Sequence, residues 1–392
     1  MNQRLQTLTL FCRVVDNYGD IGICWRLARQ LALEHHIGVT LWVDDLLSFQ
    51  RICPQVAIDQ ESQQIGDIRI RHWRDQDGVF SRDDISDIVI EFFGCELPPA
   101  YIAAMAQCQP QPVWLNLEGL SAEEWVEGCH TLSSPHPSLS LTKYFYFPGF
   151  TNKTGGLLLE ADLLQQRSQF QQNQAEQAQF LNQLGVTESE LAATKVSLFC
   201  YPQAPVHELF TVWQNSSSPV TCLVAQGVAS AALAAFFGSA IPVGSSCTRG
   251  ALTVRVIPFV AQPDYDKLLW ACDFNFVRGE DSFVRALWAA RPFVWHIYPQ
   301  DNNLHHVKLK AFLARYVDKT DAKADSLVEF FLGWNAASNT TLDFNAAWKQ
   351  IQAELQNGIA SAIKWQQQQQ LNGDLASNLL AFSETVRKKT PN

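Results

Sequence analysis

Two aspartates stand four residues apart in DNYGDIG, residues 16–22, directly after a mostly apolar run at 8–15. Carboxylates in such a loop suit a general base or a site for a cationic group. The loop is not GxGxxG, and a phosphate-binding loop would avoid two acids, so a dinucleotide site is a weak interpretation. A structural alternative makes Asp20 the N-cap of the next helix and lets Asp16 close an Asx turn. A cap needs only one of the two acids, so the presence of both favours a catalytic or binding role.

A second polar cluster, RGEDSFVRA at residues 278–286, follows an apolar run in the second half of the chain. Gly279 allows a sharp turn, Ser282 can cap a helix, and the N–H groups at a helix start favour a phosphate. Glu280 and Asp281 would repel a diphosphate, so we expect their carboxylates to face sugar or ribose hydroxyls. The alternative is an ordinary capped helix whose first-turn acids stabilise it by about 0.3–1 kcal/mol.

Nearby residues are candidates for reading a nucleotide base. An apolar run ends at residues 257–262, where backbone groups of 260–262 could bind a pyrimidine edge. Tyr265 could stack on the face of that base. Ordinary helix–sheet packing is the alternative for Tyr265. Tyr201 also ends a predicted strand, and its hydroxyl could reach a phosphate.

The sequence predicts no metal site. The histidine pairs at 35–36 and 305–306 are adjacent, which does not place two ligands on one helix face. His296 lies in an apolar strand and is interpreted as a core histidine. The DxD strings at 75–77 and 264–266 stand in a polar loop and at a helix start, and we interpret both as chance. GxSxG, P-loop and HExxH motifs are absent from the sequence.

Alternating strands and helices must position these loops. Buried strands of parallel sheets read as continuous apolar runs, and crossover helices separate them. In the first half, strands are predicted at 8–15, 39–43, 68–73, 88–92 and 112–117, with helices at 21–33 and 100–107. A polar, glutamine-rich helical segment at 158–184 follows. In the second half, strands are predicted at 195–201, 220–224, 252–257, 274–277 and 292–297, with helices at 207–213, 230–237, 264–271 and 283–290. Further helices run from about 326 to 388.

Length and composition limit the class of protein. The chain has 392 residues, of which 47% are hydrophobic and 17% charged, as in a globular protein of two or three domains. The net charge is −10, which argues against nucleic-acid partners and against docking on an anionic membrane. Residues 209–248 carry no charge, but serine, glycine and proline interruptions favour buried strand, helix and strand over a membrane span.

Cysteine usage and the N-terminus predict a cytoplasmic protein. The ten cysteines form no CxxC pair, and several lie in apolar runs, as buried thiols do in a reducing compartment. The first residues lead directly into an apolar strand and show no signal-peptide pattern.

The repeated pattern predicts an α/β protein of GT-B glycosyltransferase architecture, with two Rossmann-like domains facing across a cleft and a C-terminal helical tail. We expect an N-terminal, acceptor-side domain at 1–157 and a nucleotide-sugar domain at 158–365. The tail, at 366–392, is expected to pack back on the N-terminal domain. Because ligands of open α/β sheets bind beyond the carboxyl ends of the strands, the two polar loops fall where chemistry is expected.

Three long blocks resemble the bacterial protein-arginine rhamnosyltransferase family that modifies elongation factor P. They are DNYGDIG with WRLAR at 16–29, RGEDSFVRA at 278–286 and PFVWHIYPQ at 292–300. Weaker blocks at 42–45, 114–118, 148–150 and 155–156 agree. The resemblance covers about residues 8–310, and the long blocks are specific.

The resemblance implies roles for individual residues. Asp20 resembles the catalytic aspartate, Asp16 stands beside it, and Glu280 falls on an essential glutamate. The donor-binding residues that we predict are Asn17, Tyr18, Gly19, Tyr201, Val260, Gln262, Tyr265, Arg278, Gly279, Asp281 and Ser282. The family often has phenylalanine where this chain has Tyr18 and Tyr265, and the added hydroxyl leaves the stacking face intact.

The resemblance also implies the reaction. An inverting enzyme would move rhamnose from dTDP-β-L-rhamnose to one arginine of elongation factor P, giving an α-linked product and activating the factor. Arginine has a pKa above about 12 and is a poor nucleophile, so carboxylates that orient the guanidinium and take its proton fit this chemistry. Helix-start N–H groups and hydroxyls fit the leaving dTDP. We expect no metal, no cofactor, and neither nucleic acid nor membrane as a partner.

Two alternatives stay open from sequence. One is a GT-B enzyme that uses another nucleotide sugar and a carbohydrate or lipid acceptor. Such enzymes often carry a basic or amphipathic membrane face, which this sequence does not show. The other is a non-catalytic scaffold for a ribosome-associated protein, against which the charged pairs in both loops argue.

Overall fold

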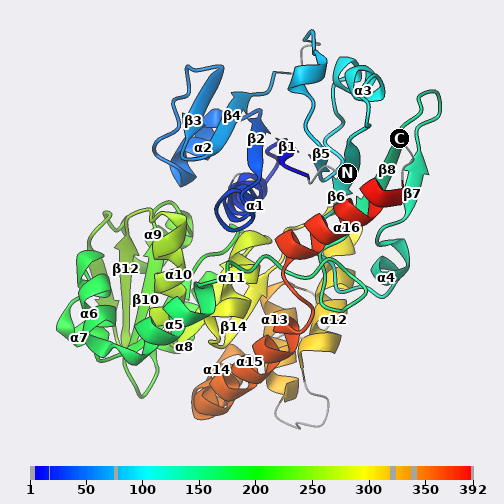
Figure 1. Ribbon diagram of the computed structural model, residues 1–392. Helices are drawn as coiled ribbons and strands as arrows, with labels where there is room; N and C mark the ends of the chain where they lie inside the picture. The colour runs from blue at the N-terminus through cyan, green and yellow to red at the C-terminus, as the bar shows by residue number, and fades with distance from the viewer. Residues whose placement is uncertain (1–4, 17, 75–77, 318–323, 337–341, 390–392) are drawn as a thin grey trace. The chain divides into compact units, whose positions relative to one another are not determined.

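The computed structural model of the protein describes residues 5–16, 18–74, 78–317, 324–336 and 342–389. The chain divides into two compact units. The first combines Met1–Ala161 with Gln369–Asn392, and the second is Asp162–Gln368. In Figure 1 the first unit carries the blue, cyan and red ends of the chain, and the second runs from green to orange.

The first unit is built on a sheet that has eight strands within the described residues, in the order β3-β4-β2-β1-β5-β6-β8-β7. The inner strands pair in parallel, and β3 and β7 pair antiparallel at the two edges. The strands are β1 (Thr7–Cys12), β2 (Gly38–Val43), β3 (Ser62–Ile65), β4 (Ile68–His72), β5 (Ile88–Phe92), β6 (Val113–Leu117), β7 (Ser133–Pro135) and β8 (Thr142–Tyr146).

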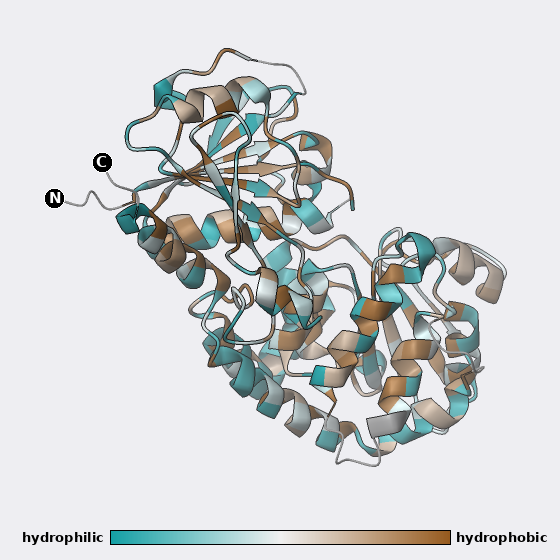
Figure 2. Ribbon diagram, turned by 90° about the vertical axis from the view of Figure 1, so that its right-hand side faces the viewer, coloured by the Kyte–Doolittle hydropathy of each residue, from teal (hydrophilic) through white to brown (hydrophobic). Residues whose placement is uncertain are grey.

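Apolar side chains explain why these central strands form. Every residue of β5 is buried, as is every residue of β1 after its first. Phe11 stacks on Trp42 with ring centroids 5.5 Å apart, and Trp73 and Tyr101 meet Phe11 edge-on. Figure 2 shows the hydrophobic colour running along the strands of this unit. These aromatic side chains stabilise the folded unit mainly because folding removes their apolar surface from water.

Helices cover the first sheet and include the last helix of the chain. They are α1 (Gly19–His35), α2 (Leu46–Ile52), α3 (Pro99–Ala106), α4 (Trp125–Cys129), the short η1 (Arg82–Asp84) and α16 (Leu375–Lys389). Helix α16, red in Figure 1, packs against α1 and β6. The C-terminal tail therefore belongs to the first unit.

The second unit is built on a sheet with six described strands, in the order β11-β12-β10-β9-β13-β14. All neighbours are parallel except β11, which pairs antiparallel with β12 at one edge. The strands are β9 (Thr194–Leu198), β10 (Val220–Ala225), β11 (Ser246–Arg249), β12 (Leu252–Ile257), β13 (Phe274–Arg278) and β14 (Phe293–His296).

The helices of the second unit pack on both the sheet and one another. They are α5 (Leu163–Gln172), α6 (Gln174–Gln183), α7 (Glu188–Leu191), α8 (Val206–Gln214), α9 (Ser230–Phe237), α10 (Gln262–Ala271), α11 (Asp281–Ala289), η2 (Asp301–Asn303), α12 (Leu304–Tyr316), α13 (Ala324–Trp334), α14 (Phe344–Ala353) and α15 (Leu355–Gln370). The fully buried Trp213 and Trp334 pack against Phe276 of β13, and the equally buried Trp348 packs against Trp213.

The structure refines what the sequence predicted for the segments 158–184 and 209–248. The helical segment predicted at 158–184 breaks at Asn173, whose side chain caps α6 by accepting the N–H of Glu176. The charge-free stretch 209–248 holds the end of α8, then β10, α9 and most of β11. In the part of the chain that the structure describes, no helix combines the length and apolarity that crossing a membrane requires.

In both sheets the strand order reverses beside the first strand of the unit. In the first sheet β2 and β4 lie on one side of β1, and β5 lies on the other. In the second, β10 and β12 lie on one side of β9, and β13 lies on the other. Open α/β sheets bind ligands beyond the carboxyl ends of the strands at such reversals. Residues 16–22 follow β1 and residues 278–286 begin at the end of β13, so both polar loops lie at a reversal.

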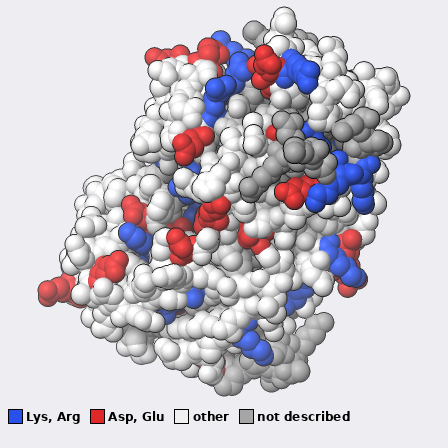
Figure 3. Space-filling model, in the orientation of Figure 1, with Lys and Arg blue, Asp and Glu red and all other residues white. Residues whose placement is uncertain are grey.

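Charged side chains are mixed on the surface. On the face drawn in Figure 3, Lys and Arg alternate with Asp and Glu, and the coloured residues form no broad basic patch there. This agrees with the net charge of −10.

Candidate active site

The Asp20 side chain closes the loop after β1. Asp20 is the second residue of α1 and is only 4% exposed. Its Oδ2 accepts the backbone N–H groups of Val15, at 2.7 Å, and Asp16, at 2.8 Å. Burial raises the pKa of this carboxyl, the two N–H groups oppose the rise, and the charges of Asp16 and Asp44 add to it. Asp20 therefore takes up a proton more readily than an ordinary aspartate, as a general base must.

The N-cap role weighed for Asp20 is wrong. The N-cap of α1 is Tyr18, which makes no side-chain cap hydrogen bond, and Asp20 bonds backwards to the loop. The turn contains a hydrogen bond from the N–H of Gly19 to the carbonyl of Asp16, at 2.7 Å. A Cβ atom at Gly19 would lie 3.0 Å from Oδ2 of Asp16, so glycine leaves room for that carboxylate. The predicted donor-binding residue Asn17 lies outside the described residues.

Polar groups at the neighbouring strand ends share this edge of the first sheet. Asp44 follows β2, and its Oδ1 accepts the N–H of Val14 at 2.9 Å. Asn116 of β6 accepts the N–H of Gly94 at 2.9 Å and donates to Glu118 at 2.7 Å. Sequence reasoning gave Asp44 and Asn116 no individual role. The sequence signal that could have found them is a polar residue within a predicted buried strand or directly after one.

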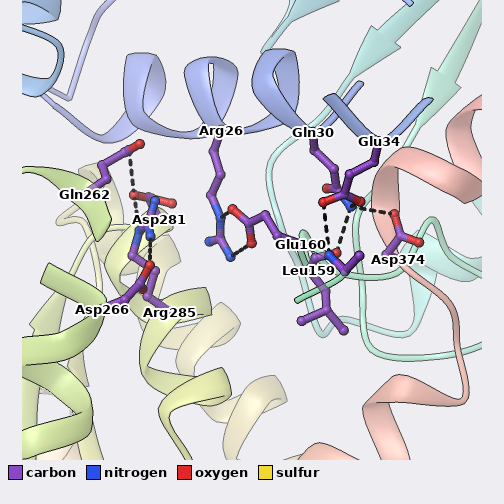
Figure 4. A network of polar contacts seen from close by, with 11 residues as sticks. Arg26, Gln30, Glu34, Leu159, Glu160, Gln262, Asp266, Asp281, Arg285 and Asp374 are labelled. Atoms are coloured by element: carbon purple, nitrogen blue, oxygen red, sulfur yellow. Dashed lines mark hydrogen bonds and ion pairs between the residues drawn. The ribbon is translucent and has the colours of Figure 1, made fainter. Parts of the chain in front are cut away.

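A row of side chains on α1 anchors the helix that carries Asp20. Arg26 has a fully buried side chain and pairs with Glu160 through two hydrogen bonds, of 2.6 and 2.7 Å (Figure 4). Gln30, one turn further on, donates to the carbonyl of Leu159 at 2.7 Å and to Asp374 at 3.1 Å. Both segments through which the chain leaves and re-enters the first unit are thus fastened to α1.

At the edge of the second sheet, Arg278 lies over two aromatic rings. Its guanidinium carbon is 4.3 Å from the centre of Phe199 and 4.9 Å from that of Tyr201, and Nη1 donates to the carbonyl of Cys200 at 3.1 Å. Gly279 has φ 63°, a backbone conformation that favours glycine, and its carbonyl accepts Nε1–H of Trp295 at 2.7 Å. These contacts place a fixed positive charge beside the end of β13, where an anionic ligand would be stabilised.

Tyr201 lies after β9 and contacts the end of β14. Its N–H donates to Nδ1 of His296 at 3.2 Å, and its ring meets His296 edge-on at 5.2 Å and Tyr298 at 5.7 Å. Burial lowers the pKa of His296 to about 4, and Arg278 and His305 add to the shift. His296 is therefore a neutral core histidine, as predicted.

Two helices start at this edge of the second sheet. Helix α10 begins at Gln262, and the half-buried Val260 lies in the loop before it. Helix α11 begins at Asp281 with Glu280 as the N-cap, so Ser282 is the second helical residue and the capping role predicted for it is wrong. The N–H groups in the first turn of a helix favour anionic ligands.

Tyr265 packs between its helix and the sheet, as its alternative role predicted. Its ring meets Phe199, which follows β9, edge-on at 6.0 Å. Burial raises the pKa of the Tyr265 hydroxyl, and the neighbouring Ser282 hydroxyl opposes the rise. The Tyr265 ring therefore lies near the start of α11. This packing is compatible with a role in donor binding.

A buried ion cluster joins the two helix starts (Figure 4). Nε of Arg285 donates to Oδ2 of Asp281 at 2.8 Å, and Nη1 donates to Oδ2 of Asp266 at 2.6 Å. Gln262 donates to the same oxygen of Asp281 at 3.3 Å. Sequence reasoning did not single out Asp266 as a site residue or Arg285 at all.

The structure places the described site residues in two groups, one at the carboxyl edge of each sheet. The first group is Asp16, Tyr18, Gly19 and Asp20, and the second is Tyr201, Val260, Gln262, Tyr265, Arg278, Gly279, Glu280, Asp281 and Ser282. The three predicted catalytic carboxylates are therefore divided between the units.

The described residues can be searched for metal-binding clusters and for disulfides. Among its described residues, no cluster of three or more His, Cys, Asp or Glu could hold a metal ion. The DxD string at 75–77 lies outside those residues, and Asp266 of the other string binds Arg285. All ten cysteines are described, and none is in a disulfide.

Two sheets of this topology define a class of fold. The fold matches MurG of Acinetobacter baumannii, at 12% identity and a TM-score of 0.51, over 97% of this chain and 99% of that one. It also matches a glycosyltransferase of Rickettsia africae, at 8% identity and a TM-score of 0.53, over 99% of both chains. The chain has the GT-B glycosyltransferase fold, with a helical C-terminal tail.

Closer relatives narrow the class to one family. A family model for the elongation-factor-P rhamnosyltransferase EarP matches residues 8–384. The protein-arginine rhamnosyltransferase of Pseudomonas putida is 46% identical over 96% of this chain and 98% of its own length. That of Pseudomonas aeruginosa is 43% identical over 95% and 97%. The chain therefore belongs to the EarP family of rhamnosyltransferases and is an enzyme.

A solved structure of the family agrees. It is described as the structural basis for EarP-mediated arginine glycosylation of translation elongation factor EF-P, and it is 34% identical to this chain. The match covers 97% of this chain and 99% of that chain, with a TM-score of 0.69. The resemblance read from the sequence blocks is thereby confirmed.

Proposed function

We propose that this enzyme transfers rhamnose from dTDP-β-L-rhamnose to an arginine side chain of elongation factor P, with inversion, and so activates the factor. Family membership supports the acceptor and the sugar. The observation that carries the chemistry is Asp20, a buried carboxyl whose pKa is raised and whose position is fixed by two backbone N–H groups.

The arginine side chain must be bound and deprotonated as it reacts. A guanidinium is delocalised and a weak nucleophile, so its attacking nitrogen gains most from a carboxylate that takes its proton during bond formation. Asp20 takes that role, and Asp16 and Asp44 add negative charge to the same edge of the sheet, which favours a cationic acceptor. Asp16 binds and orients the guanidinium.

The reaction is a single in-line displacement. The bond from the arginine nitrogen to the anomeric carbon forms, the bond from that carbon to the phosphate oxygen breaks, and dTDP leaves with the electron pair. The nitrogen proton passes to Asp20. One displacement inverts the configuration, so a β-linked donor gives an α-linked product.

The second unit holds the donor. Tyr265 and Gln262 bind the thymine, with backbone groups at Val260. Tyr201 and Arg278 bind the diphosphate, with the N–H groups that start α11 and the Ser282 hydroxyl. Glu280 and Asp281 accept hydrogen bonds from the sugar and ribose hydroxyls. The remaining predicted donor-binding residues are Asn17, Tyr18 and Gly19.

Positive charge and oriented N–H groups can stabilise the leaving diphosphate without a metal ion. We therefore propose metal-independent transfer, without a cofactor, in the cytoplasm, where the factor works. Turnover that is unchanged in excess EDTA is the expected result. A loss that added Mg²⁺ restores would contradict it.

The test is intact-mass spectrometry of elongation factor P after incubation with the enzyme and dTDP-L-rhamnose. A gain of one deoxyhexose is expected, and it should disappear when the acceptor arginine is replaced by lysine. No mass change, with dTDP still raising the melting temperature, would mean another sugar or acceptor. No mass change and no dTDP binding would favour a scaffold.

A further inference from the structure

Arg285 stands in the interior of the second unit, between two carboxylates. Its side chain is 1% exposed, and those of Asp266 and Asp281 are 8% and 12% exposed. Buried charges persist only when they are paired, and removing one partner leaves the other uncompensated. The cluster is therefore a fixed part of this edge of the sheet.

The three charged groups come from two different helices. Asp281 and Arg285 lie one turn apart at the start of α11, and Asp266 lies in the first half of α10. Gln262, the first residue of α10, donates to the oxygen of Asp281 that Arg285 also binds. Two contacts thus tie the start of α11 to α10: Arg285 binds Asp266, and Gln262 binds the Asp281 carboxylate that Arg285 holds (Figure 4).

The planar guanidinium explains why an arginine stands here. Its N–H groups point in fixed directions, so Nε and Nη1 can each bind a carboxylate from a different helix. A lysine ammonium has no such fork. The positive charge also offsets part of the negative charge that Asp281 would otherwise present to a diphosphate near the start of α11.

We infer that Arg285 is a positioning residue for the nucleotide part of the donor. It sets the spacing of α10, which carries Gln262 and Tyr265, and the start of α11, which carries Asp281 and Ser282. It also fixes the Asp281 carboxylate. This assignment rests on the proposed function, because those four residues are the proposed donor contacts.

The experiment measures dTDP binding by calorimetry for Arg285→Lys, Arg285→Met and Asp266→Asn. Each variant should bind dTDP about tenfold or more weakly, the size of one lost charge-assisted hydrogen bond. Because the groups act as one unit, Arg285→Met combined with Asp266→Asn should lose no more affinity than the worse single change. The KM for the donor should rise in parallel, and kcat at saturating donor should stay within about threefold of the unchanged enzyme.

Arg255 provides the matched control. It is a buried arginine of the same unit, 6% exposed, and pairs with Glu190 at 2.9 Å. Arg255→Met removes an equivalent ion pair from β12 and should leave dTDP affinity unchanged even if the melting temperature falls. Equal weakening by Arg255→Met would mean general loosening and would overturn the assignment.

The remaining outcomes are also decisive. Unchanged dTDP affinity in Arg285→Lys and Asp266→Asn would overturn the positioning role while the proposed function stands. Additive losses in the double variant would show that the two residues act separately, and the tie between the helices would be wrong. If the unchanged enzyme binds no dTDP, the proposed donor is wrong, and so is the positioning role of Arg285 that rests on it.

Discussion

The backbone N–H of Tyr201 donates to Nδ1 of His296 across 3.2 Å, which holds the imidazole with its proton on Nε2. His296 is 5% exposed, and burial is the main reason that its pKa falls to about 4. The loop after β9 is therefore fastened to the end of β14 by a neutral ring.

Burial of His296 makes the stability of the folded state depend on pH. In the unfolded chain the histidine takes up a proton below about pH 6.5, whereas the folded state resists protonation down to about pH 4. The contribution of His296 to stability is therefore fully present above about pH 6.5 and is lost as the pH falls through this window. At pH 5 the loss should be about 2 kcal/mol. The free energy of unfolding, measured in urea at pH 7.5 and at pH 5, should fall less between these pH values in His296→Gln than in the unchanged enzyme. Equal losses in the two proteins would show that His296 does not cause the pH dependence.

Asp20→Asn should separate activity from stability. Loss of the general base should lower kcat by at least about 10²-fold while dTDP affinity changes little. Because burial raises the pKa of Asp20, its negative charge costs more free energy in the folded state than in the unfolded chain. Asparagine can accept the same two N–H groups without the charge, so the melting temperature at pH 7.5 should not fall. Strong residual turnover would exclude the base role.

Tyr265→Ala should weaken dTDP binding by roughly 1–3 kcal/mol, the range for stacking of a base on an aromatic ring. Tyr265→Phe keeps the ring and serves as the control, with affinity within a few-fold of the unchanged enzyme. Calorimetry with dTDP measures both. If alanine and phenylalanine behave alike, the ring does not stack on the base.

Gly19→Ala tests the room left for Asp16. The new Cβ would lie 3.0 Å from Oδ2 of Asp16, so that carboxylate must shift by a few tenths of an ångström. Gly19 is the first residue of α1, where alanine is a good helix former, so the melting temperature should hold or rise. Displacement of a group that orients the acceptor should lower kcat/KM for elongation factor P by about tenfold. Unchanged kcat/KM would mean that Asp16 does not orient the acceptor.

The sequence predicted the central strands well because burial on both faces leaves a continuous apolar run. IVIEF at 88–92 and LTVRVI at 252–257 come close to such runs, with four apolar residues in each, and they match β5 and β12. The edge strands β3, with SQQI, and β11, with SCTR, went unnoticed because solvent on one side permits polar residues. Their pairing depends on a neighbouring strand and has no local signature.

For the candidate site, the sequence predicted which loops carry it but not how their side chains are held. Asp20 and Glu280 stand beside glycine turns after apolar runs, which marks both positions. How the side chains are held was not readable. Asp20 bonds backwards to Val15 and Asp16, and Arg285 reaches Asp266 on another helix, 19 residues away in sequence. Such pairings are set by tertiary packing, and spacing along one helix does not predict them.

The first unit also contains residues from the far end of the chain, and this affects the order of folding. Leu375 donates its N–H to the carbonyl of Leu157, Gln30 binds Asp374, and Arg387 donates to the carbonyl of Gln111. During synthesis these partners leave the ribosome only after all of residues 162–368 have been made. The strands of both sheets are therefore made before α16, and the first unit waits, with one face of α1 uncovered, for this last helix.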